Sequence, residues 1–117
     1  MMATWQPNGS MPLFEQVAAE IRKSIVEGEV NPGQRLPPAR DFASVLGVNT
    51  NTVLRAIRQL RDEGVLEFRR GRGISVVGTP DKVELDQAIR WIRDLGSRLG
   101  YQPSELAKFV LDGASRN

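Results

Sequence analysis

The stretch from residue 36 to residue 77 constrains the fold of this chain more than any other part of its sequence. It contains two runs of apolar residues at helical spacing, and only Gly47 and Val48 separate them. So short a connection is typical of a helix-turn-helix. Two β-prone runs follow, on either side of a loop of arginine and glycine at residues 69–73. We therefore predict two helices joined by a tight turn and followed by a β-hairpin.

The remaining elements are predicted from apolar spacing and from the positions of proline and glycine. We expect helices at about 12–27, 38–46, 49–63 and 103–114, a tail helix between residue 79 and Gly100, and a short strand at 34–36. In the helix at 49–63, Asn49 is a good N-cap, and the core stripe consists of Val53, Ile57 and Leu60. The last helix is expected to bury Leu106 and Val110. The predicted fold class is mainly α with a small β-hairpin (α+β).

Three segments are predicted: a flexible N-terminal arm at 1–11, a compact domain at 12–78, and a two-helix C-terminal segment at 79–117. The arm contains Pro7, Asn8 and Gly9, which favour irregular backbone. No apolar run approaches ~18 residues, and no secretory signal is present at the N-terminus. We therefore expect a cytoplasmic protein without a membrane partner.

Two residue types are absent from the 117 residues: cysteine and histidine. The absence of cysteine excludes disulfides, thiolate nucleophiles and zinc-finger ligand sets. The absence of histidine excludes most catalytic triads and most histidine-based metal sites. No paired-carboxylate cleft is evident either. We therefore predict no catalytic residues, no cofactor and no metal, and we do not expect an enzyme.

The positive charge of the chain is concentrated in its middle third. Residues 40–78 hold 7 arginines against 4 acidic residues, a net charge of +3, whereas 1–39 sum to −1 and 79–117 to zero. Arginine is suited to bidentate contacts with phosphate and guanine. A merely solvated basic surface remains the alternative, because +3 is a small excess.

The outer face of the predicted helix at 49–63 carries hydrogen-bonding groups. Asn51, Arg55 and Arg58 lie at i, i+4 and i+7, and Thr50 and Thr52 lie in the first turn. Asparagine can pair with adenine and arginine with guanine in the major groove of DNA. For any one of these residues a solvated helix face is the simpler explanation, but the set as a whole favours base contacts.

The predicted hairpin loop combines flexibility with charge. Gly71 and Gly73 permit the positive φ angles that a tight turn needs, and arginines surround them at positions 69, 70 and 72. Arg69, Arg70 and Arg72 could reach phosphates or an A·T minor groove. The alternative is a plain solubilising edge.

Two arginines outside this loop have competing explanations. Arg40 could contact a phosphate or form a salt bridge with a nearby acid, and the sequence leaves both open. Arg61 lies late in its helix beside Asp62, so we expect a surface ion pair there.

Three motifs, in this order, resemble the GntR family of bacterial transcription regulators. They are Pro12 to Val17 (PLFEQV), Gly28 to Pro37 (GEVNPGQRLP) and Arg69 to Gly73 (RRGRG). The resemblance covers roughly residues 12–77 and implies a winged helix-turn-helix that binds a palindromic double-stranded operator as a homodimer, usually as a repressor. The helix at about 49–63 would enter the major groove, and the wing (residues 69–73) would lie on the backbone or minor groove. By position, the family's DNA contacts fall on Arg40, Asn49, Thr50, Asn51, Thr52, Arg70 and Gly71.

The chain also departs from the common family pattern. Many members carry arginine where this chain has Thr50 and Leu54, and the nearest substitute is Arg55, about 100° further around the helix. The tip from Asn49 to Val53 instead resembles the short-tailed YtrA-like subfamily. Ala39 replaces the acidic residue that usually precedes Arg40, which could free that arginine for phosphate.

The tail is predicted to make the dimer, as the subfamily resemblance also implies. The tail has a larger apolar face than its own 39 residues can bury, so a second copy of the tail is expected to cover it. The alternative is that this face packs on the first helix of the same chain. The predicted dimerisation residues are Leu85, Ala88, Ile89, Trp91, Ile92, Leu95, Leu99, Leu106 and Val110. An unknown small-molecule effector could bind near Trp91, Tyr101 or Phe109, but aromatic residues in such places are more often part of a core.

A second class of function remains open from the sequence. A winged helix can serve as a protein-interaction module that has lost DNA binding. The basic excess confined to residues 40–78 argues against this alternative.

Overall fold

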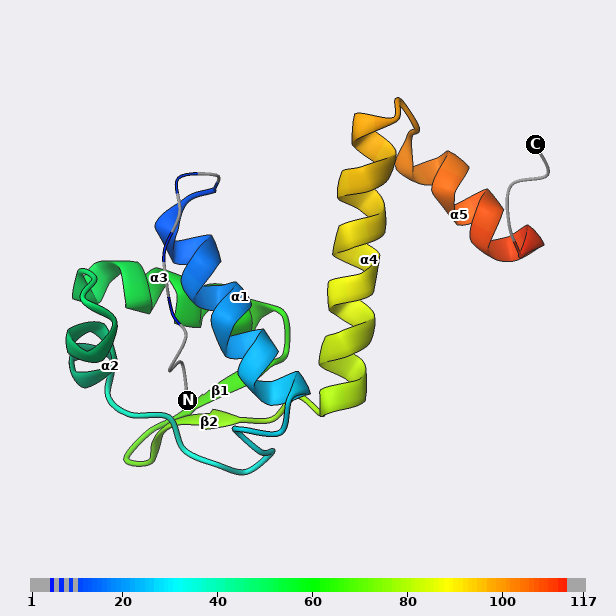
Figure 1. Ribbon diagram of the computed structural model, residues 1–117. Helices are drawn as coiled ribbons and strands as arrows, with labels where there is room; N and C mark the ends of the chain where they lie inside the picture. The colour runs from blue at the N-terminus through cyan, green and yellow to red at the C-terminus, as the bar shows by residue number, and fades with distance from the viewer. Residues whose placement is uncertain (1–4, 6, 8, 10, 114–117) are drawn as a thin grey trace. The chain divides into compact units, whose positions relative to one another are not determined.

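The computed structural model describes residues 5, 7, 9 and 11–113 (Figure 1). Its elements in chain order are α1 (Leu13–Val26), α2 (Ala39–Leu46), α3 (Thr50–Asp62), β1 (Leu66–Arg69), β2 (Gly73–Val76), α4 (Pro80–Arg98) and α5 (Pro103–Asp112). The predicted fold class is therefore confirmed. The chain divides into two compact units, the first ending at Val83 and the second beginning at Glu84.

The core of the first unit is built where α1 and α3 meet. Val17, Ile21 and Ile25 from α1 are fully buried there. Val53, Ile57 and Leu60 from α3 are buried as well, as predicted from their spacing. Burial of each such side chain contributes about 1.5–3 kcal/mol relative to exposure. Because this stripe faces the core, the opposite face of α3 is directed to solvent.

The turn between α2 and α3 has the predicted geometry. Gly47 ends α2 in the left-handed region, with φ 70°, and the Val48 backbone N–H donates to the Ala43 carbonyl at 3.1 Å. Asn49 is the N-cap of α3, and its Oδ1 accepts from the Asn51 backbone N–H at 2.7 Å. The two helices are thus joined by a short turn whose backbone is held by hydrogen bonds.

The hairpin is antiparallel, with Leu66 opposite Val76 and Arg69 opposite Gly73. Beside it, the predicted strand at 34–36 is reduced to one bridge, between Arg35 and Ser75. Backbone hydrogen bonds on either side of the bridge, such as Leu36 N–H to the Ile74 carbonyl at 2.8 Å, attach this segment to β2. Proline at the next two positions prevents a longer strand, since it lacks the N–H donor.

Two predicted termini differ from the structure or fall beyond it. Residues 1–4, 6, 8 and 10 of the predicted arm lie outside the described residues, and Trp5 packs against the core. The helix expected to reach about Ala114 ends at Asp112, because Gly113 adopts φ 89°. Ala114 itself lies outside the described residues.

The second unit contains most of α4 and all of α5. The two helices pack closely at Gly96, where an added Cβ would lie 2.6 Å from Leu106 Cδ1. Tyr101 and Phe109 also pack edge to face, with ring centres 5.2 Å apart. This contact favours a role for the two rings within the tail rather than in an effector pocket.

The prediction that the last helix buries Leu106 and Val110 is wrong for the single chain. Leu106 is half-buried against Gly96, whereas Val110 is 72% exposed. One neighbouring helix can cover only one stripe of α5. No helix in the described part of the chain is both long and apolar enough to cross a membrane.

Candidate nucleic-acid interface

The outer face of α3 presents the predicted polar side chains. Asn51 and Arg58 are exposed, and neither side chain bonds to another residue in the part of the chain that the structure describes. Thr50 and Thr52 are half-buried in the first turn. The face has the donors and acceptors that base edges require, and it is open to an incoming duplex.

Asn49 has a structural task in addition to its predicted DNA contact. Its side-chain oxygen caps the Asn51 backbone N–H, so only its amide group is left to donate to a ligand. The residue thereby fixes where α3 begins. A DNA contact by Asn49 stays a prediction.

Arg55 is exposed but held on one side by an aromatic ring. Its guanidinium carbon lies 3.8 Å from the centre of the Phe14 ring, a cation–π contact between α3 and α1. Helical spacing predicts Arg55 on the side of α3 that would face DNA, and it gives no sign of this aromatic partner. No pattern within α3 could have indicated it, because Phe14 belongs to a distant part of the chain.

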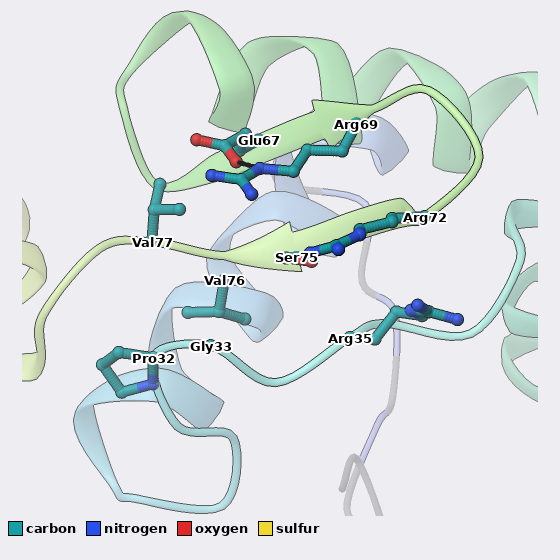
Figure 2. Close-up of a pocket in the computed structure, with 9 residues that line it drawn as sticks. All are labelled: Pro32, Gly33, Arg35, Glu67, Arg69, Arg72, Ser75, Val76 and Val77. Atoms are coloured by element: carbon teal, nitrogen blue, oxygen red, sulfur yellow. Dashed lines mark hydrogen bonds and ion pairs between the residues drawn. The ribbon is translucent and has the colours of Figure 1, made fainter.

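The wing is a tight turn in which one arginine is ion-paired and two are not paired with any described residue. Gly71 and Gly73 adopt φ 79° and 76°, as the predicted turn requires, and Gly73 belongs to the β ladder together with Arg69. Arg69 forms an ion pair with Glu67 on the same strand (Figure 2). Arg70 and Arg72 are exposed and form no ion pair with any described residue. These two are the wing cations most available to phosphate.

Of the two arginines with competing explanations, one is resolved. Arg61 forms the predicted surface ion pair with Asp62, at 3.3 Å. Arg40 is exposed, and the described residues provide it with no ion-pair partner. The salt-bridge alternative for Arg40 therefore receives no support.

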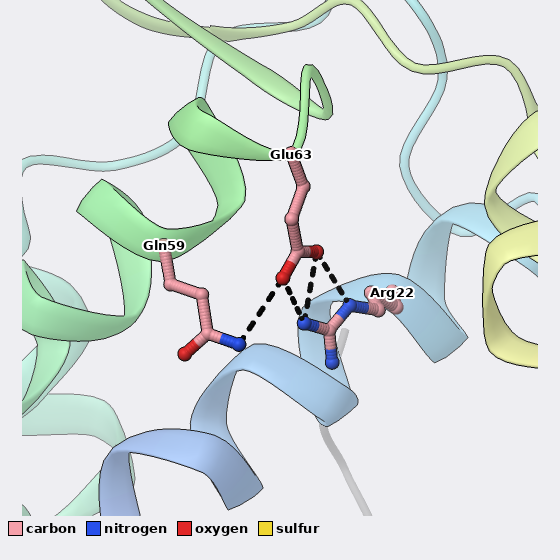
Figure 3. Close-up of polar contacts among 3 residues, drawn as sticks. All are labelled: Arg22, Gln59 and Glu63. Atoms are coloured by element: carbon pink, nitrogen blue, oxygen red, sulfur yellow. Dashed lines mark hydrogen bonds and ion pairs between the residues drawn. The ribbon is translucent and has the colours of Figure 1, made fainter. Parts of the chain in front are cut away.

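A buried ion pair braces α1 against the end of α3 (Figure 3). Arg22 donates to both carboxylate oxygens of Glu63, at 2.9 and 2.8 Å through Nη2 and at 3.1 Å through Nε. Gln59 donates to the same carboxylate at 3.1 Å. The pair is remote from the outer face of α3, but it sets how α3 lies on α1. This ion pair is not predicted from the sequence, because no local spacing signals a contact over 41 positions.

The sequence profile described as "Bacterial regulatory proteins, gntR family" matches residues 13–76, which is more than half of the chain and includes α1 to β2. The chain belongs to the GntR family. The predicted resemblance is thereby confirmed, and the helix-turn-helix with its hairpin is the part that members share.

Individual relatives support the same assignment. The HTH-type transcriptional repressor YtrA of Bacillus subtilis (strain 168) is 37% identical over 67 residues, which are 57% of this chain and 52% of that repressor. The chain thus spans about half the length of this curated relative. The relatives are named as transcriptional regulators, not as enzymes. Among the described residues, no group of three or more His, Cys, Asp or Glu could hold a metal ion.

Solved structures resemble the chain over both partial and nearly full length. A GntR family transcriptional regulator from Listeria monocytogenes has a TM-score of 0.68 at 25% identity, covering 91% of this chain and 98% of that one. AraR(DBD) in complex with operator ORR3 has a TM-score of 0.55 at 32% identity, covering 62% of this chain and 92% of that one. The second of these is a DNA complex.

Proposed function

We propose that this chain is a transcriptional repressor that binds a palindromic DNA operator as a homodimer. The observation that carries the proposal is the exposed face of Asn51 and Arg58 on α3, together with the two wing arginines, at 70 and 72, that form no ion pair with any described residue. An operator complex of a structural relative, AraR(DBD), supports the DNA-binding part. YtrA of Bacillus subtilis, a relative that is named a transcriptional repressor, supports repression rather than activation.

In this proposal each protomer contributes three contacts to the duplex. The recognition helix at about 49–63 enters the major groove, where Asn51 and Arg58 read base edges. The wing follows the backbone or the minor groove with Arg70 and Arg72. Arg40 holds a phosphate near the start of α2. The half-sites lie about one DNA turn, ~34 Å, apart.

Exposed apolar side chains on the tail support the homodimer. Trp91 on α4 is 62% exposed, Leu99 directly after α4 is 66% exposed, and Val110 on α5 is 72% exposed. Leu85, Ile89 and Ile92 are exposed as well. Exposed apolar side chains in this number favour an interaction site, and a two-fold contact between identical tails would cover them.

Fluorescence anisotropy with duplexes from the gene's own upstream region tests the proposal. At about 50 mM salt we expect tight binding to one palindromic duplex and much weaker binding to a shuffled duplex of the same composition. Asn51→Ala should reduce the difference in affinity between the two duplexes. Arg70→Ala should weaken binding to both duplexes by the same factor. Equal binding of both duplexes by the wild type would refute sequence-specific binding. A biological output unchanged by both substitutions would favour the protein-interaction module.

A further inference from the structure

The outer face of the hairpin carries a row of polar side chains that the proposed DNA contacts do not explain. Glu67 lies opposite Ser75 in the β1–β2 ladder, and Ser75 in turn bridges Arg35 on the neighbouring segment. Because side chains alternate along a strand, Arg69 shares the face of Glu67, whereas Leu66 and Val76 point into the core. Three separate segments thus place polar groups on one surface (Figure 2).

This surface is hollowed. A cavity of about 450 Å³ lies over it, with apolar residues at one end and arginines around the rest. Its lining consists of Pro32, Gly33, Arg35, Glu67, Arg69, Arg72, Ser75, Val76 and Val77. The Arg69 and Arg72 side chains lie over the hairpin itself, and Arg35 lies on the adjoining segment (Figure 2). The volume is within the range of small-molecule sites.

The charge of the lining is unbalanced. The lining contains three arginines and one carboxylate, that of Glu67. This carboxylate already forms an ion pair with Arg69. Arg35 and Arg72 are exposed and form no ion pair within the described residues. The lining thus contains two guanidinium groups without an ion-pair partner among the described residues, and the half-buried Ser75 adds a hydroxyl to it. Guanidinium groups match the oxygen geometry of phosphate, and a hydroxyl can donate to a further oxygen.

We propose that this cavity is a phosphate-binding site, formed by Arg35 and Arg72 and separate from the base-reading face of α3. Its occupant is a phosphate ester, either a backbone phosphate of flanking DNA or the phosphate of a free small molecule. The first source rests on the proposed function, and the second does not. Glu67 limits the affinity of the site, because it competes with the ligand for Arg69 and repels the phosphate charge.

Phosphate binding by itself is tested with the full-length chain and inorganic phosphate as the probe. Backbone amide chemical shifts are followed by NMR, with sodium chloride at equal ionic strength as the reference. We expect phosphate to shift the amides of Ser75, Val76 and Val77 well beyond the effect of chloride. Arg35→Gln and Arg72→Gln should each weaken binding about tenfold, as expected for the loss of one charge-assisted hydrogen bond.

Two further variants make the titration specific. Glu67→Gln should strengthen phosphate binding, because it removes the only negative charge of the lining. Lys23→Gln removes an exposed positive charge of α1 and should leave binding unchanged. Equal responses to phosphate and chloride, or equal losses in Arg35→Gln and Lys23→Gln, would overturn the proposal.

The source of the phosphate is distinguished by binding to the operator at several salt concentrations. If DNA supplies it, Arg35→Gln should reduce the slope of log K against log salt by about 0.9, on operator and shuffled duplexes alike. If a small molecule supplies it, the slope should not change, and inorganic phosphate should alter operator affinity in the wild type but not in Arg35→Gln. If the chain binds its operator and shows neither of these two effects, a functional phosphate site is refuted. If no operator is bound at all, the proposed function fails, and the phosphate titration still decides the site.

Discussion

The guanidinium of Arg55 stacks on the ring of Phe14, 3.8 Å from its centre, and so links the outer face of α3 to the first turns of α1. Phe14 is half-buried and packs against the core, so its ring is a fixed platform. A guanidinium held in this way would lose less side-chain entropy in the predicted contact of Arg55 with DNA. Phe14 is therefore expected to act as a positioning residue for Arg55.

Replacement of Phe14 tests this relationship. Phe14→Leu should weaken operator binding by about two- to fivefold, because an exposed cation–π contact contributes roughly 0.5–1 kcal/mol. Phe14→Tyr keeps the ring and should bind like the wild type. Anisotropy titrations measure both, and thermal melting confirms that the variants are folded. Equal losses in the two variants would show that the ring does not orient Arg55.

Removal of one partner from the Arg22–Glu63 pair should destabilise the first unit. The two side chains are only 7% and 17% exposed, so Arg22→Met leaves a carboxylate that is desolvated and without its cation. We expect a loss of about 3 kcal/mol in the free energy of unfolding, measured by urea denaturation. Arg61→Met, which breaks the exposed pair with Asp62, should cost less than about 1 kcal/mol. Similar costs for the two variants would contradict this account.

Two substitutions of Asn49 should separate capping from DNA contact. Asn49→Ala removes the acceptor for the Asn51 N–H and should cost about 1 kcal/mol of stability. Asn49→Asp keeps the acceptor and should melt like the wild type, since a negative charge suits a helix N-terminus. The same charge should weaken operator binding by repelling phosphate, most strongly at low salt. Wild-type affinity in Asn49→Asp would place this residue away from the DNA.

A single charge on the tail should abolish the proposed dimer. Leu99→Glu introduces a carboxylate directly after α4, at an exposed apolar position, and sedimentation velocity should then show a monomer. Operator affinity should fall at least tenfold, because two half-sites are no longer bound together. Ser97→Glu adds the same charge at an exposed position about 160° around the helical path from Leu99, and as the matched control it should remain dimeric. A monomeric wild type would refute the dimer directly.

The sequence by itself determined those features that depend on neighbouring residues. Gly47 and Asn49 signalled the turn because one adopts a left-handed φ and the other caps the next residue but one. The spacing of Val53, Ile57 and Leu60 identified the buried side of α3, and so also its solvent side. Each of these signals lies within one or two turns of chain.

Only the tertiary structure decided which distant side chains meet. The side-chain contacts of Arg22 with Glu63 and of Arg55 with Phe14, and the backbone bridge between Arg35 and Ser75, depend on how α1, α3 and the hairpin pack. The tertiary structure also showed that Val110 has no cover within its own chain, whereas spacing alone suggested burial. Periodicity reports that a face is apolar, but the packing partner of that face is set by contacts that no local pattern encodes.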